Sequence, residues 1–217
     1  MYTLITLPLL AYLVGSIPNA VWIGRVFYGV DVRNEGSRNA GTTNVIRVLG
    51  LKPGLCVLAL DLLKGLFPLA VLFMFFEKMP FFEGMSDDFY FWFEIGVALA
   101  TVVGHVFPVY VGFRGGKGVA ALVGVLIMLY PQVFPFVFSI FFGMLFAFRY
   151  VSLSSITAAI SLPLLQFAFF QTEKTPLLIF AIFITIFVAM THIQNIKRLL
   201  RREESKFVFK KTHYPTS

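Results

Sequence analysis

Seven apolar runs, separated by short polar segments, fill most of this sequence. A run of about 17–25 apolar residues is long enough for a helix to cross the hydrocarbon core of a bilayer. The N-terminal segment lacks the basic start of a cleaved signal peptide, so it is taken as part of the first span. The sequence therefore predicts an all-α integral membrane protein with seven transmembrane helices. The expected spans are about 2–28, 54–76, 91–112, 118–131, 132–148, 154–171 and 176–192.

The composition agrees with a chain that has the bilayer as its solvent. Of the 217 residues, 58% are hydrophobic and 13% are charged, and the mean hydropathy is +0.83. A water-soluble domain cannot bury that much apolar surface. The length suffices for one helical bundle, so we expect a single domain over residues 1–217 with a basic cytoplasmic tail at 192–217.

The basic residues predict the orientation of the spans, because cytoplasmic loops of membrane proteins collect Lys and Arg. With seven spans the N-terminus lies outside, the C-terminus lies in the cytoplasm, and nearly all 18 basic residues fall on the cytoplasmic side. If the fourth and fifth runs formed one long kinked helix, six spans would move the Arg149 loop and the tail to the opposite face, against this rule. The exceptions are Lys64 within a span and Lys78 and Lys174 outside, the last two beside Glu77, Glu83, Asp87, Asp88, Glu94 and Glu173.

Three polar, glycine-rich stretches fall on the predicted cytoplasmic side: Arg33–Gly50, Gly104–Ala121 and Thr191–Arg202. Charged and backbone-exposing residues are costly near lipid, so their gathering at one face predicts a functional site there. A purely structural membrane subunit would leave this clustering unexplained. An anion transporter is the main rival to an enzyme, but acidic outer loops and motifs at one end only disfavour it.

The first stretch combines small polar side chains with glycines and arginines. Glycines let backbone N–H groups converge on an anion, and a threonine starting a short helix would add that helix's N-terminus. A solvated basic loop would explain the arginines but not the density of Ser, Asn, Thr and Gly, so we expect an anion site. Its members are Ser37, Asn39, Thr42, Thr43 and Asn44, with Gly36 and Gly41 between them and Arg38 and Arg47 nearby.

The second and third stretches carry complementary chemistry. Gly115, Gly116 and Lys117 open an apolar helix, and backbone amides beside an ammonium suit a phosphate. Their spacing is not that of a Walker A loop, so nucleotide binding by that route is not expected. His192 and Asn195 are three residues apart, share one helix face and could orient a substrate hydroxyl. The basic run after them suits anionic lipid headgroups.

Other polar residues in the spans have open interpretations. Asp61 and Lys64 are three residues apart and can pair, either for structure alone or in support of a site. The break at Gly15–Asn19 is interpreted as close helix packing, with Asn19 facing a polar cavity as the alternative, and His105 is interpreted as a structural hydrogen-bonding residue. Metal-ligand spacings are missing, so no bound metal is expected, and the GxSxG nucleophile elbow is missing as well.

The segments GSRNAGTTNVIRVLG, GHVFP…FRGGKGVA and HIQNIKRLL, with DLLKG and RYVSLSSITA between them, resemble the bacterial PlsY family. These are integral-membrane acyl-phosphate:glycerol-3-phosphate acyltransferases. The resemblance runs from Gly15 to about Leu200 and is specific, because five patches occur in the right order. It implies a multi-pass protein of the bacterial inner membrane with a cytoplasmic site, and it implies no cofactor. Nucleic acid and an obligate protein partner are not expected; membrane lipids are.

The resemblance also implies a reaction and a set of site residues. A fatty acyl group would pass from acyl phosphate to the 1-hydroxyl of sn-glycerol 3-phosphate and form lysophosphatidate, the first acylation step of phospholipid synthesis. The sequence departs from the usual pattern at Arg38 (usually Gly), Thr42 (Ala), Thr191 (basic) and Gln194 (Glu), which concerns fine positioning. Carried over by motif, the site residues are Ser37, Asn39, Thr43, Asn44, Arg47, Gly115, Gly116, Lys117, Ser155, His192 and Asn195.

Both substrates carry a phosphate, so the site must hold several negative charges close together. We expect Gly115–Lys117 and the Ser37–Asn44 loop to hold the donor phosphate. Glycerol 3-phosphate is expected on Arg47, Lys117, Ser155, His192 and Asn195, and the residues interpreted as catalytic are His192, Asn195 and Lys117. No side-chain base is evident, so the hypothesis gives the hydroxyl proton to the donor's own phosphate. All of this requires the three stretches to fold into one pocket.

Overall fold

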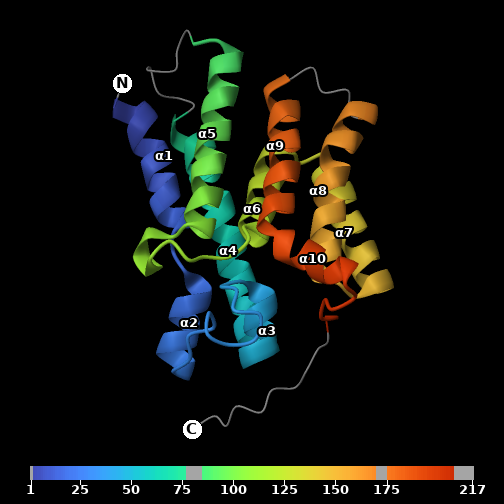
Figure 1. The fold of residues 1–217 in the computed structure, drawn as a ribbon. Coiled ribbons are helices and arrows are strands. Elements are labelled where there is room, and N and C mark those ends of the chain that lie inside the picture. Colours follow the sequence, from blue (N-terminus) through green and yellow to red (C-terminus); the bar gives the residue numbers. More distant parts are fainter. Residues whose placement is uncertain (1, 77–84, 170–174, 208–217) are drawn as a thin grey trace. The chain divides into compact units, whose positions relative to one another are not determined.

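A computed structural model describes residues 2–76, 85–169 and 175–207, and within these ranges all regular structure is helical (Figure 1). The chain divides into two compact units. Within the described ranges, the first unit comprises residues 2–71 and 97–125, and the second comprises 72–76, 85–96, 126–169 and 175–207. The helices are α1 (Tyr2–Gly15), α2 (Asn19–Tyr28), α3 (Thr42–Leu49), α4 (Leu51–Val71), the π-helix η1 (Leu72–Phe76), α5 (Asp87–Val106), the 3₁₀ turn η3 (Val109–Val111), α6 (Val119–Leu129), α7 (Phe134–Phe148), α8 (Val151–Ala168), α9 (Thr175–Thr191) and α10 (Ile193–Leu200).

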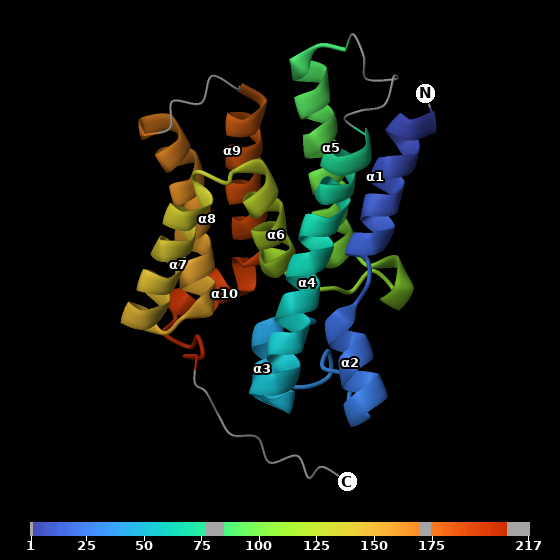
Figure 2. The same cartoon turned by 180° about the vertical axis from the view of Figure 1, so that it is seen from behind.

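The first unit is built along α4, against which α1, α2 and α3 pack (Figure 2). Two helix crossings in this unit are close enough to require glycine. A Cβ on Gly15 of α1 would overlap the carbonyl oxygen of Thr101 in α5, and one on Gly65 of α4 would overlap that of Ala121 in α6. Small residues permit such approaches between membrane helices. The prediction that Gly15 marks close helix packing is confirmed.

An apolar core holds the short helix α3 and the loop that precedes it. Val32 and Ala40, at the two ends of that loop, are both buried in it, so the polar segment between them is anchored at each end. Removal of these side chains from water supplies the driving force, at about 25 cal/mol per Å² of apolar surface. The buried members of this core are Ala20, Val21, Val32, Ala40, Val45, Val48, Leu49 and Val57.

In the second unit, α7 and α8 form a hairpin, α9 packs on α8, and α10 contacts both α8 and α9 (Figure 2). The hairpin turns at Arg149, which has φ 62° and whose N–H bonds to the carbonyl of Leu145. The hydroxyl of Thr185 in α9 donates to the carbonyl of Ala159 in α8 at 2.7 Å. At His192 the chain turns by 63° from α9 into α10.

The helices agree with the predicted apolar runs in part. Within the described residues, four stretches are long and apolar enough to cross a membrane: Leu4–Tyr28, Leu51–Phe75, Asp87–Val111 and Val151–Ala168. The bent pair α9–α10 gives a fifth if it is counted as one span, while the fourth and fifth predicted runs correspond to the shorter helices α6 and α7. The count of seven spans and the sidedness of the termini therefore stay predictions, as does the single domain.

The helices add detail to three of the expected runs. The first run is interrupted where the sequence predicts its break: the chain leaves helical geometry at Ser16–Pro18, where proline lacks the N–H that a helix needs. The third run is α5 followed by a separate 3₁₀ turn. The six-span alternative needed a continuous helix over 118–148, but α6 and α7 are separate helices. Some charges used for the orientation lie outside the described residues: Glu77, Lys78, Glu83, Glu173, Lys174, Lys210 and Lys211.

Candidate active site

Asn44 shapes the first polar stretch from inside. Its side chain is buried at 2% exposure, and its Oδ1 accepts the backbone N–H of Ser37 at 2.7 Å. Its Nδ2 donates to the carbonyls of Val32 and Glu35 at 2.8 and 3.1 Å. The loop therefore wraps around one amide. Arg38 within it has φ 59°, a left-handed conformation that favours the glycine the similar family usually has there.

Replacement of Asn44 by aspartate is expected to destabilise the fold by about 2–4 kcal/mol. The change is nearly isosteric, but it turns the donating Nδ2 into an oxygen that faces two carbonyl oxygens. Thermal unfolding in detergent measures the effect. Asn34→Asp, at an exposed position of the same loop, is the matched control and should change little. Equal stability of the two variants would show that Asn44 does not shape the loop.

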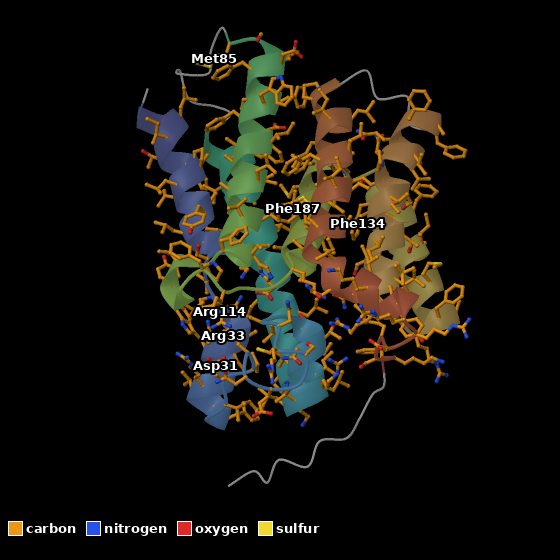
Figure 3. The ribbon with its side chains drawn as sticks, in the orientation of Figure 1. Asp31, Arg33, Met85, Arg114, Phe134 and Phe187 are labelled. Atoms are coloured by element: carbon orange, nitrogen blue, oxygen red, sulfur yellow. The ribbon has the colours of Figure 1, made fainter. Side chains whose placement is uncertain are left out.

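Asp31 and Arg33, both labelled in Figure 3, connect the start of this loop to η3. The Asp31 carboxylate accepts bonds from the side chain and backbone of Arg33 and, at 2.7 Å, from Arg25. The Arg33 guanidinium also donates to the carbonyl of Val111 at 2.8 Å. Hydrogen bonds from Arg33, and then from Arg25, hold the pKa of Asp31 well below its ordinary value of 3.8 although partial burial opposes this. The hydrogen bonds to Asp31 also raise the pKa of Arg33. Both side chains are therefore charged, and their attraction holds the start of the loop in place.

The second stretch packs directly on the first. The backbone N–H groups of Gly115 and Gly116 donate to the carbonyls of Val106 and His105 at 3.1 and 3.3 Å, which folds the glycines onto the end of α5. A Cβ on Gly116 would overlap Nε2 of His105 and lie 3.0 Å from the carbonyl oxygen of Ala40. Ala40 precedes Gly41, the N-cap of α3. Lys117 follows Gly116, and α6 begins two residues later.

This packing changes which amides could bind an anion. The N–H groups of Gly115 and Gly116 were expected to face a phosphate, but they are bonded within the fold. The first amides of α3 and α6, in contrast, have no carbonyl partner inside their helices, and a helix N-terminus carries partial positive charge. The Thr42 hydroxyl at the start of α3 is buried without a hydrogen-bond partner among the described residues. The two helix starts, with Lys117 beside the start of α6, are therefore better placed to bind an anion than the amides of Gly115 and Gly116.

Gly116→Ala is expected to lower the apparent melting temperature in detergent by several degrees, because the new methyl group must displace the His105 ring. Overpacking of a tight contact typically costs about 1–3 kcal/mol. Gly96→Ala in α5 is the control, since its Cβ would meet no atom within 4 Å. If Gly116→Ala matched the stability of Gly96→Ala, the loop around Gly115 and Gly116 (the glycine loop) would not pack against His105 as described.

A buried polar cluster underlies the glycine loop. Asp61 Oδ1 accepts Nδ2 of Asn19 at 2.9 Å and lies 3.0 Å from Nζ of Lys64 and 3.8 Å from Nδ1 of His105. The Lys64 ammonium also donates to the carbonyl of Ile17 at 2.7 Å, in the break between α1 and α2. The predicted Asp61–Lys64 pair is confirmed. A polar environment for Asn19 was the less favoured of two interpretations, and its bond to Asp61 was not predicted because the two residues lie far apart in sequence.

In the second unit, His192 closes α9 in a defined tautomer. Its ring is 2% exposed, and Nδ1 lies 2.9 Å from the carbonyl oxygen of Val188 and 3.3 Å from the hydroxyl of Thr191. A carbonyl can only accept, so Nδ1 carries the proton, and in the neutral ring Nε2 is an acceptor. An acceptor nitrogen at this position can orient a hydroxyl group.

Asn195 and Ser152 donate hydrogen bonds to a carboxylate that sequence reasoning did not single out, Glu204. Glu204 Oε1 accepts Nδ2 of Asn195 at 2.6 Å and Oγ of Ser152 at 2.7 Å, and its Oε2 accepts Nε of Arg198 at 2.7 Å. Burial raises the pKa of Glu204, but the hydrogen bonds from Asn195, Arg198 and Ser152 outweigh it, and the net pKa is lowered. Ser155 is buried, and its hydroxyl donates to the carbonyl of Val151 at 2.9 Å.

The predicted site residues fall into two groups. The first unit contains Ser37, Asn39, Thr43, Asn44, Arg47, Gly115, Gly116 and Lys117, and the second contains Ser155, His192 and Asn195. The convergence of all three polar stretches stays a prediction. Among the described residues no group of three or more His, Cys, Asp or Glu could hold a metal ion.

Comparison with known proteins agrees with these motifs. Residues 5–202 match the family model of glycerol-3-phosphate acyltransferase. Similar chains are the glycerol-3-phosphate acyltransferases of Fusobacterium nucleatum, 40% identical over 92% of this chain and 96% of that one, and of Listeria welshimeri, 42% identical over 94% and 96%.

Two crystal structures of PlsY (YgiH), an integral membrane glycerol 3-phosphate acyltransferase, are also similar, and each comparison covers 95% of this chain and 96% of that one. The glycerol 3-phosphate form has a TM-score of 0.82 at 40% identity, and the lysophosphatidic acid form has 0.79 at 38%. This chain thus shares the all-helical integral membrane fold of PlsY and belongs to the glycerol-3-phosphate acyltransferase family.

Proposed function

We propose that this chain takes its acyl group from acyl phosphate and transfers it to the 1-hydroxyl of sn-glycerol 3-phosphate, with lysophosphatidate and phosphate as products. One observation supports the donor most directly. Gly116 packs on Ala40, so the starts of α3 and α6 lie near Lys117 in one unit. Two helix N-termini and an ammonium suit a phosphate, and acyl phosphate carries its phosphate next to the reacting carbon. The crystallised relative in its lysophosphatidic acid form supports the product.

In this reaction the acceptor hydroxyl oxygen forms the ester bond to the acyl carbon, and the bond from that carbon to the phosphate oxygen breaks. The hydroxyl proton ends on the released phosphate. Phosphate is a good leaving group, so the protein chiefly orients the hydroxyl and stabilises the negative charge that develops on the acyl oxygen. His192, protonated on Nδ1, suits the orienting role, and Asn195 three residues away assists it.

The same proposal assigns roles to the remaining predicted residues. Lys117 and the Ser37–Asn44 loop hold the donor phosphate, and Arg47, Ser155 and Lys117 contribute to binding of glycerol 3-phosphate. The enzyme lies in the bacterial inner membrane as a multi-pass protein with its site toward the cytoplasm. The acyl chain lies against lipid-exposed helix surface, where each buried methylene contributes about 0.8 kcal/mol.

An assay of donor specificity tests the proposed reaction. Purified protein in detergent receives labelled glycerol 3-phosphate with acyl phosphate, acyl-CoA or an acyl-carrier-protein thioester as the only donor. Labelled lysophosphatidate should form with acyl phosphate and should be at background with the two thioesters. Formation from a thioester but not from acyl phosphate would overturn the proposed donor.

A further inference from the structure

Glu204 is the acidic residue that lies among the polar residues of α8 and α10. Its carboxylate accepts hydrogen bonds from Asn195, Ser152 and Arg198 at 2.6–2.7 Å, and its side chain is 10% exposed. Ser152 and Asn195 are themselves buried, at 4% and 6% exposure. Three donors from two helices thus converge on one carboxylate, which is more than a surface ion pair provides.

The backbone reverses direction after α10, and this reversal places Glu204 beside α8 and α10. At the end of α10, Arg202 has φ 60°, and the N–H groups of Arg202 and Glu203 bond to the carbonyls of Leu199 and Arg198 at 3.1 and 2.8 Å. This is the Schellman pattern, which reverses the chain after a helix. Arginine in a left-handed conformation costs about 1–2 kcal/mol, so the reversal is held by its surroundings.

The returning segment is also fastened beyond Glu204. The backbone N–H of Phe207 donates to the carbonyl of Arg149 at 2.6 Å, at the turn between α7 and α8. Glu204 is therefore held between two backbone anchors, one at the end of α10 and one at the start of α8. The interpretation of the basic tail as a segment suited to anionic lipid headgroups stays a prediction, and the contacts of residues 201–207 add a role within the fold.

We propose that Glu204 is a positioning residue for the acceptor substrate: it fixes the Asn195 amide so that Oδ1 accepts a hydroxyl of glycerol 3-phosphate. This inference rests on the proposed role of Asn195 in orienting that substrate. With Nδ2 committed to Glu204, the amide cannot flip, and its other end can only accept a hydrogen bond. A substrate hydroxyl can donate a hydrogen bond to this oxygen, whereas the ionised oxygens of a phosphate only accept hydrogen bonds.

The charge of Glu204 acts in the same direction. The carboxylate neutralises Arg198, the cation nearest to Asn195 in this hydrogen-bond network, and would repel a phosphate placed there. The phosphate of the acceptor is therefore directed elsewhere, and the hydroxyl end is directed to Asn195. In this way Glu204 selects the orientation in which the acceptor binds.

Steady-state kinetics of Glu204→Gln and Glu204→Ala test the proposal, with the neighbouring exposed Glu203→Gln as the control of equal charge change. Both Glu204 variants should raise KM for glycerol 3-phosphate about tenfold, which corresponds to about 1.4 kcal/mol, and leave KM for the acyl donor unchanged. Glu203→Gln should behave as the parent. Thermal stability in detergent, measured alongside, identifies any variant that fails to fold. Glu204→Gln is included because its remaining acceptor oxygen can keep part of the hydrogen bonding and so preserve the fold.

A double-mutant comparison separates positioning from general structural support. In an Asn195→Ala background, Glu204→Gln should have no further effect on kcat/KM for glycerol 3-phosphate, because the residue it positions is gone. An undiminished effect in that background would overturn the proposal. So would a rise in kcat/KM, which would mean that the carboxylate blocks the acceptor site, or an equal rise in KM for both substrates. If the parent enzyme used a thioester, the donor assignment would fail, yet the same test could be run with that donor.

Discussion

Replacing Lys117 by methionine is expected to lower kcat for acyl transfer by about 100- to 1,000-fold, the usual loss when one electrostatic contact to a developing negative charge is removed. Methionine keeps the length and apolar stem of lysine, so the change isolates the ammonium group. Lys117 lies between Gly116, which packs on the loop before α3, and the start of α6. Initial rates with acyl phosphate and glycerol 3-phosphate measure the effect.

Lys52→Met is the matched control, because Lys52 is an exposed lysine near the start of α4 in the same unit. It should retain near-parental turnover, which would exclude a general effect of lowered positive charge. The predicted site would be wrong if Lys117→Met and His192→Ala both retained near-full turnover.

The second large effect is expected at the buried ion pair. Asp61→Asn should reduce the free energy of unfolding by about 3–5 kcal/mol, since it leaves the Lys64 ammonium buried without its counter-charge. Lys64 is 6% exposed, and the Ile17 carbonyl to which its ammonium also donates is neutral. At the usual conversion for a chain of this size, the apparent melting temperature in detergent should fall by about 6–20 °C.

Two further variants make this result specific. Asp88→Asn, at an exposed position in the first turn of α5, removes the same charge and should have little effect. Asp61→Leu combined with Lys64→Met replaces the pair by apolar groups of similar size and should recover most of the stability. Equal melting temperatures for Asp61→Asn and the parent would show that the pair is not buried as described.

The resemblance to the acyltransferase family was readable from the sequence because its motifs are contiguous. GTTN, GGKG and the His192–Asn195 pair each lie within a few residues, so local spacing carries their chemistry. The same holds for the membrane-spanning character, which depends on run length and composition. The helix breaks were only partly readable: Pro18 signals the first, but His192 carries no comparable signal of the turn between α9 and α10.

The hydrogen-bond partners of the buried polar groups were decided by the tertiary structure. Asn19 bonds to Asp61 across 42 positions of sequence, and Glu204 bonds to Ser152 across 52, and no local periodicity encodes such partners. The glycines at 115 and 116 suggested backbone N–H groups available to an anion, yet both N–H groups donate to carbonyls at the end of α5. The sequence by itself thus determined a helical membrane enzyme of this family, because hydrophobic length and contiguous motifs are local properties. The partner of a buried polar group was decided only in the folded chain, because loss of water makes an unpaired donor or acceptor costly and favours contacts between residues far apart in sequence.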